Sequence, residues 1–132
     1  MTAETFPSGF PDDLAAAAFL TGSEAAWPPQ VASKVVEWLG QNKFAVLGTE
    51  IWTVHKDGAI TPSIEGGLYG NAVSNKGNES WGAYVCRAAD DALRCIESAN
   101  LSMEAKEQKN VFFNITWVNE SEYSDLRGPN AR

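Results

Sequence analysis

Residues 44–62 show the clearest pattern of hydrophobic and polar positions in the chain. Within it, residues 50–55 alternate, so that Ile51, Thr53 and His55 face one side while Glu50, Trp52 and Val54 face the other. A period of two, rich in β-branched and aromatic residues, is typical of a strand. Asp57-Gly58 predicts a tight primed turn, because Gly accepts a positive φ without strain. Residues 59–61 form the return strand, which Pro62 ends by removing a backbone donor. We expect this β-hairpin at the centre of a sheet.

Three segments have helical spacing. The first begins at Pro11, carries two acids near its positive end, continues through the alanines to Leu20 and stops at Thr21-Gly22. The second opens at Trp27-Pro28-Pro29, since a proline in the first turn costs little. Its apolar face comprises Val31, Val35, Trp38 and Leu39. The third and longest spans about 81–99, with Ser80 as its N-cap. Its apolar face comprises Trp81, Tyr84, Val85, Ala88, Ala92, Cys95, Ile96 and Ala99. On its polar face we expect the ion pairs Arg87/Asp91 and Asp90/Arg94.

The remaining segments complete an α+β fold. Residues 111–118 alternate, with Val111, Phe113, Ile115 and Trp117 on one side, and form a strand. A short strand at 68–73 is possible on pattern alone, whereas 119–132 is polar and is expected to fray. The order favours a largely antiparallel sheet over about 44–55, 59–62 and 111–118, with helices mainly on one face. We expect one domain over 1–132: a core of about 27–118, an N-terminal helical extension and a polar C-terminal tail.

Composition narrows the possible partners. The 132 residues carry a formal net charge of −7, which argues against nucleic acid, because phosphate binding depends on Lys and Arg. The negative charge fits a partner with a basic surface, and plain solubility explains it equally well. No apolar run approaches the roughly 18 residues of a membrane span. Asp12 and Asp13 stand where a signal peptide would be basic, so a cytoplasmic protein is expected.

Candidate catalytic and metal-binding residues are few. Cys86 and Cys95 lie on one predicted helix, roughly 13 Å apart along its axis. That exceeds the ~7 Å limit for a disulfide, so both are expected to be free thiols. A thiol enzyme would need Cys86 as nucleophile and His55, the only histidine, as base, and nothing local supports this pairing. No cofactor or metal site is expected, because the acids do not cluster at ligand spacing. Most tryptophans lie on apolar faces, and we expect Trp52 in the core.

A group of motifs nevertheless resembles a known family. They are Ala45-Val46-Leu47-Gly48, Glu50-Ile51-Trp52, Ser80-Trp81 with Tyr84, and Phe112-Phe113. Together they resemble small bacterial immunity proteins of polymorphic toxin systems, over about 27–118. The strand motif of that family reads AVLGGEVW, and Thr49 stands where its second glycine would be. The motifs are structural, so none of them transfers as a binding residue.

The resemblance implies a non-enzymatic protein that binds and neutralises one cognate toxin domain in the cytoplasm. A basic nuclease is one possible toxin, because an acidic surface would steer association with a basic cleft. Acids outside the paired helix face are Glu50, Asp57, Glu65, Glu79, Glu120, Glu122 and Asp125. From chemistry and position we expect toxin contacts at Glu65, Glu120, Glu122, Tyr123 and Asp125. The alternative is a non-toxin binding module, such as a secretion adaptor or a small-ligand carrier.

Overall fold

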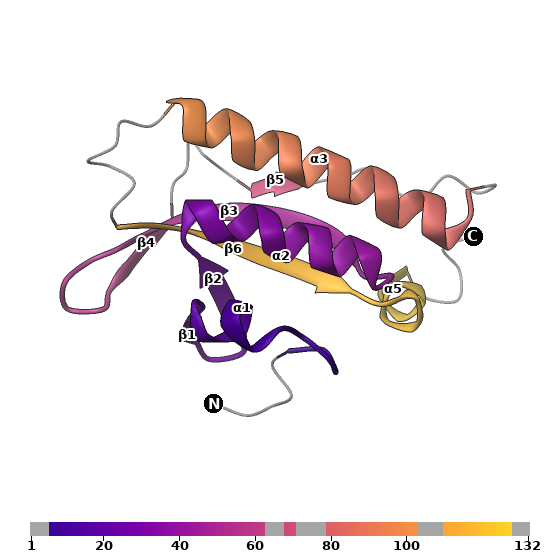
Figure 1. The fold of residues 1–132 in the computed structure, drawn as a ribbon, viewed down its shortest axis with the longest axis horizontal. Coiled ribbons are helices and arrows are strands. Elements are labelled where there is room, and N and C mark those ends of the chain that lie inside the picture. The colour runs from indigo at the N-terminus through magenta and orange to yellow at the C-terminus, as the bar shows by residue number, and fades with distance from the viewer. Residues whose placement is uncertain (1–5, 63–67, 71–78, 103–109, 128–132) are drawn as a thin grey trace.

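The computed structural model describes residues 6–62, 68–70, 79–102 and 110–127. Its strands form one sheet in the order β1-β2-β6-β3-β4, with β5 also paired to β3 (Figure 1). All the described pairings are antiparallel. The strands are Phe19–Thr21 (β1), Glu24–Trp27 (β2), Ala45–Val54 (β3), Ile60–Pro62 (β4), Leu68–Gly70 (β5) and Val111–Val118 (β6). The predicted α+β class is confirmed.

The long strand β3 pairs with β6, β4 and β5. The expected hairpin is present but is not at the centre of the sheet, because its return strand β4 lies at one edge and β6 is the middle strand. Strand β3 pairs with β6 from Ala45↔Val118 to Thr53↔Val111, and with β4 up to Trp52↔Pro62. The turn between β3 and β4 differs from the prediction. His55 N–H donates to Ala59 C=O, and Gly58 N–H donates to His55 C=O, so the loop has three residues. Only Gly58 adopts a positive φ there, at 87°. A type I turn followed by a left-handed glycine therefore replaces the primed turn.

The N-terminal segment contributes strands, where we expected a helix through Leu20. The first helix, α1, covers only Asp12–Ala16, and β1 and β2 follow as a hairpin. The alanine run has high helix propensity, but pairing β2 with β6 extends the sheet and buries Trp27 completely. The Trp27 indole N–H donates to the backbone oxygen of Leu14 over 2.7 Å. Tertiary contacts thus override local propensity, and the core begins well before residue 27.

Two helices, α2 (Pro29–Gln41) and α3 (Trp81–Ser102), lie side by side over the sheet (Figure 1). Both apolar faces match the sequence pattern, and α2 begins with a proline in its first turn as expected. The helices approach closely where Gly40 meets Ala89, because a β-carbon on Gly40 would stand 3.2 Å from that of Ala89. The main core lies between these helices and the sheet, and its fully enclosed side chains include Trp27, Val35, Leu39, Ile96 and Phe113.

Trp52 belongs to the interior, as expected. It is 4% exposed, and its indole N–H donates to Glu50 Oε1 over 2.6 Å.

Both cysteines are free thiols, as expected, with Cys86 exposed and Cys95 half-buried. Burial raises the pKa of the Cys95 thiol, and the negative charge of Asp91 raises it further.

Candidate functional site

Three of the four acids predicted to contact a partner, Glu120, Glu122 and Asp125, lie at one end of the sheet, on a helix that the sequence pattern did not predict. Residues Glu120–Arg127 form α5, directly after β6 (Figure 1). Asn119 and Glu122 form a reciprocal cap, in which each side chain accepts the other residue's backbone N–H over 2.8 Å. This is a capping box with Asn in the N-cap position. The Asn-x-x-Glu spacing is present in the sequence and could have revealed the helix. Because α5 is helical to Arg127, the expectation of a frayed tail is wrong for residues 119–127, and residues 128–132 lie outside the described residues.

An aromatic cluster holds α5 against the start of α3. Tyr123 packs against Trp81 and Tyr84, with ring centroids 5.6 and 5.2 Å apart. These rings form a second core with Ala45, Val85 and Val118. Burial, followed by the neighbouring Tyr123, raises the pKa of Tyr84 to about 12. Tyr123 therefore anchors the helix, so only the part of its side chain left exposed is open to a partner.

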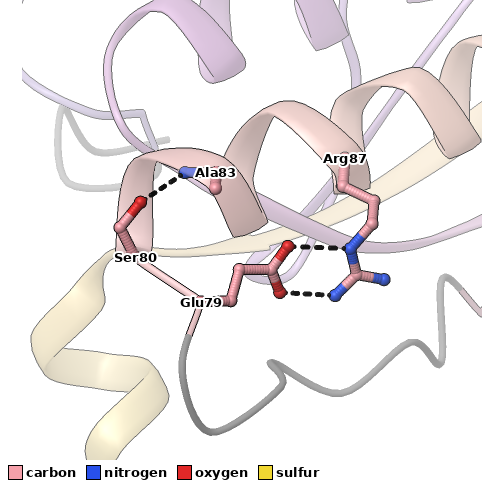
Figure 2. A network of polar contacts seen from close by, with 4 residues as sticks. All are labelled: Glu79, Ser80, Ala83 and Arg87. Atoms are coloured by element: carbon pink, nitrogen blue, oxygen red, sulfur yellow. Dashed lines mark hydrogen bonds and ion pairs between the residues drawn. The ribbon is translucent and has the colours of Figure 1, made fainter.

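The start of α3 is fixed by its own cap and by an ion pair (Figure 2). Ser80 Oγ accepts the Ala83 N–H over 3.1 Å, which confirms the predicted N-cap. The Arg87 guanidinium donates to both carboxylate oxygens of Glu79, over 3.0 and 2.7 Å. This hydrogen bond raises the pKa of Arg87. The expected Arg87/Asp91 ion pair is thus replaced by Arg87/Glu79, because a bidentate partner is reached before the helix begins.

The second expected helix pair is also rearranged. Arg94 reaches Asp91 over 3.3 Å and not the Asp90 carboxylate, while its Nε–H donates to the backbone oxygen of Asp90 over 3.4 Å. The Arg94–Asp91 pair is an exposed i,i+3 contact, and residues three apart are neighbours on a helix surface just as residues four apart are. The polar face of α3 is therefore a solvated surface, as predicted, although its pairing differs.

Lys43 lies at the end of α2, next to the start of α3. It has a φ of 68°, and among the described residues it is the only non-glycine residue with a positive φ. Lys43 N–H donates to Gly40 C=O and Phe44 N–H to Leu39 C=O, which together form a Schellman end to α2. The Lys43 backbone oxygen accepts the Trp81 indole N–H over 2.9 Å. A glycine is usual in this position, so sequence reasoning had no reason to expect Lys43 here.

Two hollows flank α5. The first, of about 820 Å³, lies between the end of α2, the start of α3 and α5, and it is lined by Asn42, Lys43, Trp81, Gly82, Asn119, Glu120, Ser121 and Ser124. The second, of about 350 Å³, lies between β2 and β6, and it is lined by Ser23, Glu24, Ala25, Asn114, Ile115, Thr116, Trp117 and Glu122. The surface around α5 is therefore indented on both sides, with one acid of α5 in each hollow.

The expected contact residues are distributed unevenly around this end of the molecule. Glu120 and Asp125 are exposed, and no hydrogen bond or ion pair joins either carboxylate to the described residues. Glu122 is exposed too, although one of its oxygens serves the cap. The structure thus brings Glu120, Glu122, Tyr123 and Asp125 onto one helix. Glu65 lies outside the described residues.

The other candidate acids have internal roles. Glu79 binds Arg87, and Glu50 accepts the Trp52 indole N–H. One oxygen of Asp57 accepts the Ala59 N–H over 2.9 Å and stabilises the hairpin loop. Their charges are partly committed within the chain, so among the described candidate acids those of α5 are the ones left for an external partner.

The geometry does not support a thiol–histidine pair. His55 follows β3 and bonds Thr61 over 2.7 Å, whereas Cys86 lies in the part of α3 that covers the opposite end of β3. Ten residues of strand separate these ends by about 30 Å.

The described residues bring no three His, Cys, Asp or Glu side chains together as metal ligands. None of the described helices combines the length and apolar character needed to cross a membrane.

A comparison with protein families identifies the chain. A family model described as Immunity protein 40 matches residues 14–117, well over half of the sequence. The match covers the sheet, α2 and α3, and it ends before α5. Neither the curated proteins nor the solved structures contain a match to the chain. The chain therefore belongs to the Immunity protein 40 family and is an immunity protein of the polymorphic toxin systems, with a toxin-neutralising role.

Proposed function

We propose that the chain neutralises one cognate toxin domain by binding it through α5 and the hollows beside it. The observation that carries this proposal is the exposure of Glu120, Glu122 and Asp125 on a helix that is capped and anchored at one end of the sheet. A helix with a rigid backbone holds its side chains in defined positions. A binding site on such a helix therefore loses less conformational entropy when a partner binds.

The charge of the chain suggests the chemistry of the partner. A net charge of −7 and an acidic α5 fit a toxin with a basic face, as expected for a nuclease that holds nucleic acid in a positive cleft. Electrostatic complementarity of this kind mainly accelerates encounter. The proposed mode of action is therefore rapid capture of the toxin in the cytoplasm, followed by physical obstruction of its active cleft.

Stopped-flow association with the toxin domain encoded beside this gene tests the binding surface. We expect Glu120→Gln/Asp125→Asn to slow association roughly threefold to tenfold at low salt, and added salt to slow the unmodified protein. The control is Glu37→Gln/Glu97→Gln, which removes the same charge from exposed positions on α2 and α3. Equal slowing by both pairs would place the contact elsewhere. Failure of the unmodified protein to bind would contradict the choice of toxin and, with it, the proposed function.

Protection assays test whether catalysis is involved. Immunity proteins generally act without catalysis, and we propose the same here. Cys86→Ser and His55→Ala should each leave protection against the toxin unchanged, because both side chains are exposed and neither is needed for a purely binding role. Loss of protection in either variant, with unfolding stability preserved, would contradict a purely binding role.

A further inference from the structure

The hollow between β2 and β6 exposes part of a strand edge. The described pairing of these strands consists of Trp27↔Phe113 and Ala26↔Asn114, and it stops there. Continued pairing would place Glu24 opposite Thr116 and Ser23 opposite Trp117, but these four residues line the hollow instead. At this point the Asn114 side-chain amide donates to the backbone oxygen of Ala25 over 2.9 Å. A side chain thus completes the end of the ladder, and beyond it β6 has no strand partner on this side among the described residues.

The orientation of the backbone follows from the pairing on the other side of β6. Val54 N–H donates to Asn110 C=O, so even-numbered residues of this strand direct their backbone groups toward β3. Odd-numbered residues direct theirs toward β2, because the direction alternates along an antiparallel strand. Ile115 and Trp117 are the odd-numbered residues of β6 beyond the described pairs. Trp117, which would stand opposite Ser23, therefore directs its N–H and C=O toward the hollow. Such a strand edge is a template for another strand.

The charges around this edge indicate the occupant. Glu24 from β2 and Glu122 from α5 both line the hollow, and both are exposed. No Lys or Arg of the described residues lines it. The other hollow, by contrast, is lined by Lys43 as well as Glu120, and the Lys43 Nζ lies 3.4 Å from where a β-carbon on Gly82 would stand. The hollow between β2 and β6 is thus the one that complements positive charge.

We propose that a short extended segment of the toxin, carrying a lysine or arginine, enters the hollow between β2 and β6 and pairs with the backbone of Trp117. The added segment occupies the position beside β6 that β2 no longer fills beyond Ala25. Its basic side chain lies between Glu24 and Glu122. Main-chain hydrogen bonds provide affinity in strand addition, and the flanking side chains provide specificity. This inference rests on the proposed function and specifies how the toxin is held.

Amide hydrogen exchange, resolved by residue, tests the strand pairing directly. The probe is the purified toxin domain encoded beside this gene. In the free protein the Trp117 amide should exchange quickly, and in the complex it should exchange at least about tenfold more slowly. The Phe113 amide is the internal control, because it is paired to Trp27 already and should change little. An unchanged Trp117 rate in a formed complex would overturn the proposal, as would a Trp117 amide already protected in the free protein.

A charge reversal tests the basic side chain. Glu24→Lys should weaken toxin binding roughly tenfold, because it places a positive charge where the toxin is proposed to place its own. The matched control is Glu37→Lys on α2, which should change affinity less than about twofold. Equal effects of the two variants would overturn the proposal and leave the proposed function intact. Absence of any complex with the unmodified protein would instead contradict the proposed function itself.

Discussion

Thr49 carries a buried hydroxyl on β3. The residue is 1% exposed, and its Oγ1 has no hydrogen-bond partner among the described residues. It stands where the resembling strand motif has glycine. An unsatisfied buried hydroxyl costs about 1–3 kcal/mol, whereas an apolar group of the same shape carries no such penalty. The position is therefore suboptimal for stability.

Thr49→Val should raise the free energy of unfolding by about 1 kcal/mol, because it keeps the branched shape and removes the unsatisfied group. Urea denaturation measures the change. The control is Thr53→Val on the same strand, where the half-buried side chain should give a smaller gain. A loss of stability in Thr49→Val would mean that the hydroxyl is satisfied.

Tyr84, in the aromatic cluster, makes the stability of the folded protein depend on pH. Its pKa is raised to about 12, chiefly by burial, so the folded state favours the neutral phenol. An unfolded tyrosine ionises near pH 10, so this contribution to stability is fully present below pH 10 and is lost as pH rises toward 12. Urea denaturation at pH 9 and pH 11 should show the loss, and Tyr84→Phe should show less of it. An equal fall in both proteins would assign the pH dependence to other groups.

At the scale of elements, the helix ends decide the shape of the site. Lys43 ends α2 in a left-handed conformation, and its backbone oxygen holds Trp81 at the start of α3. A left-handed conformation costs a residue with a β-carbon roughly 1–2 kcal/mol. The ends of α2 and α3 are therefore joined through a conformation that glycine would adopt more easily.

Lys43→Gly should stabilise the protein by about 1 kcal/mol, because glycine adopts a positive φ without steric cost. Thermal or urea unfolding measures this, and the Trp81 contact is kept because it uses a backbone oxygen. Asn42→Gly is the control, since Asn42 has a φ of −107° and gains nothing from glycine. A stabilising effect in the control alone would contradict the interpretation of this helix end.

At the scale of the molecule, Trp27 joins the N-terminal segment to the main core. It is fully buried, donates to Leu14, and contacts Phe10 and Trp117 at centroid distances of 6.1 Å. One side chain thus connects the start of the chain, β2 and β6. The N-terminal residues Phe10 and Leu14 pack in the same core cluster as the helices and the sheet.

Trp27→Ala should cost about 3–5 kcal/mol of unfolding free energy, because it leaves a large cavity and removes the partner of the Leu14 carbonyl. Urea denaturation followed by far-UV circular dichroism measures it. Trp38→Ala, which removes a half-buried indole from α2, should cost less. If the two variants lost equal stability, Trp27 would not have this central role.

The sequence by itself determined the elements whose pattern agrees with their environment. β6, α2 and α3 each have one strongly apolar face, and burial against a neighbour follows directly from that pattern. Ser80 capped α3 as predicted, because capping depends on residues only three apart. The motifs around β3 and α3 also indicated the family correctly.

Tertiary structure decided what depends on contacts between distant segments. Local propensity favours a helix over the alanines before β1, but the strand partner of β2 lies almost ninety residues later in β6. Arg87 pairs with Glu79 and not with the predicted Asp91 for a similar reason. Glu79 lies before the start of α3, so the helical periodicity of the sequence does not indicate this pair. The hollows beside α5 are formed by elements separated along the chain, so no local pattern could reveal them. Only folding brings Glu24 and Glu122 to one strand edge.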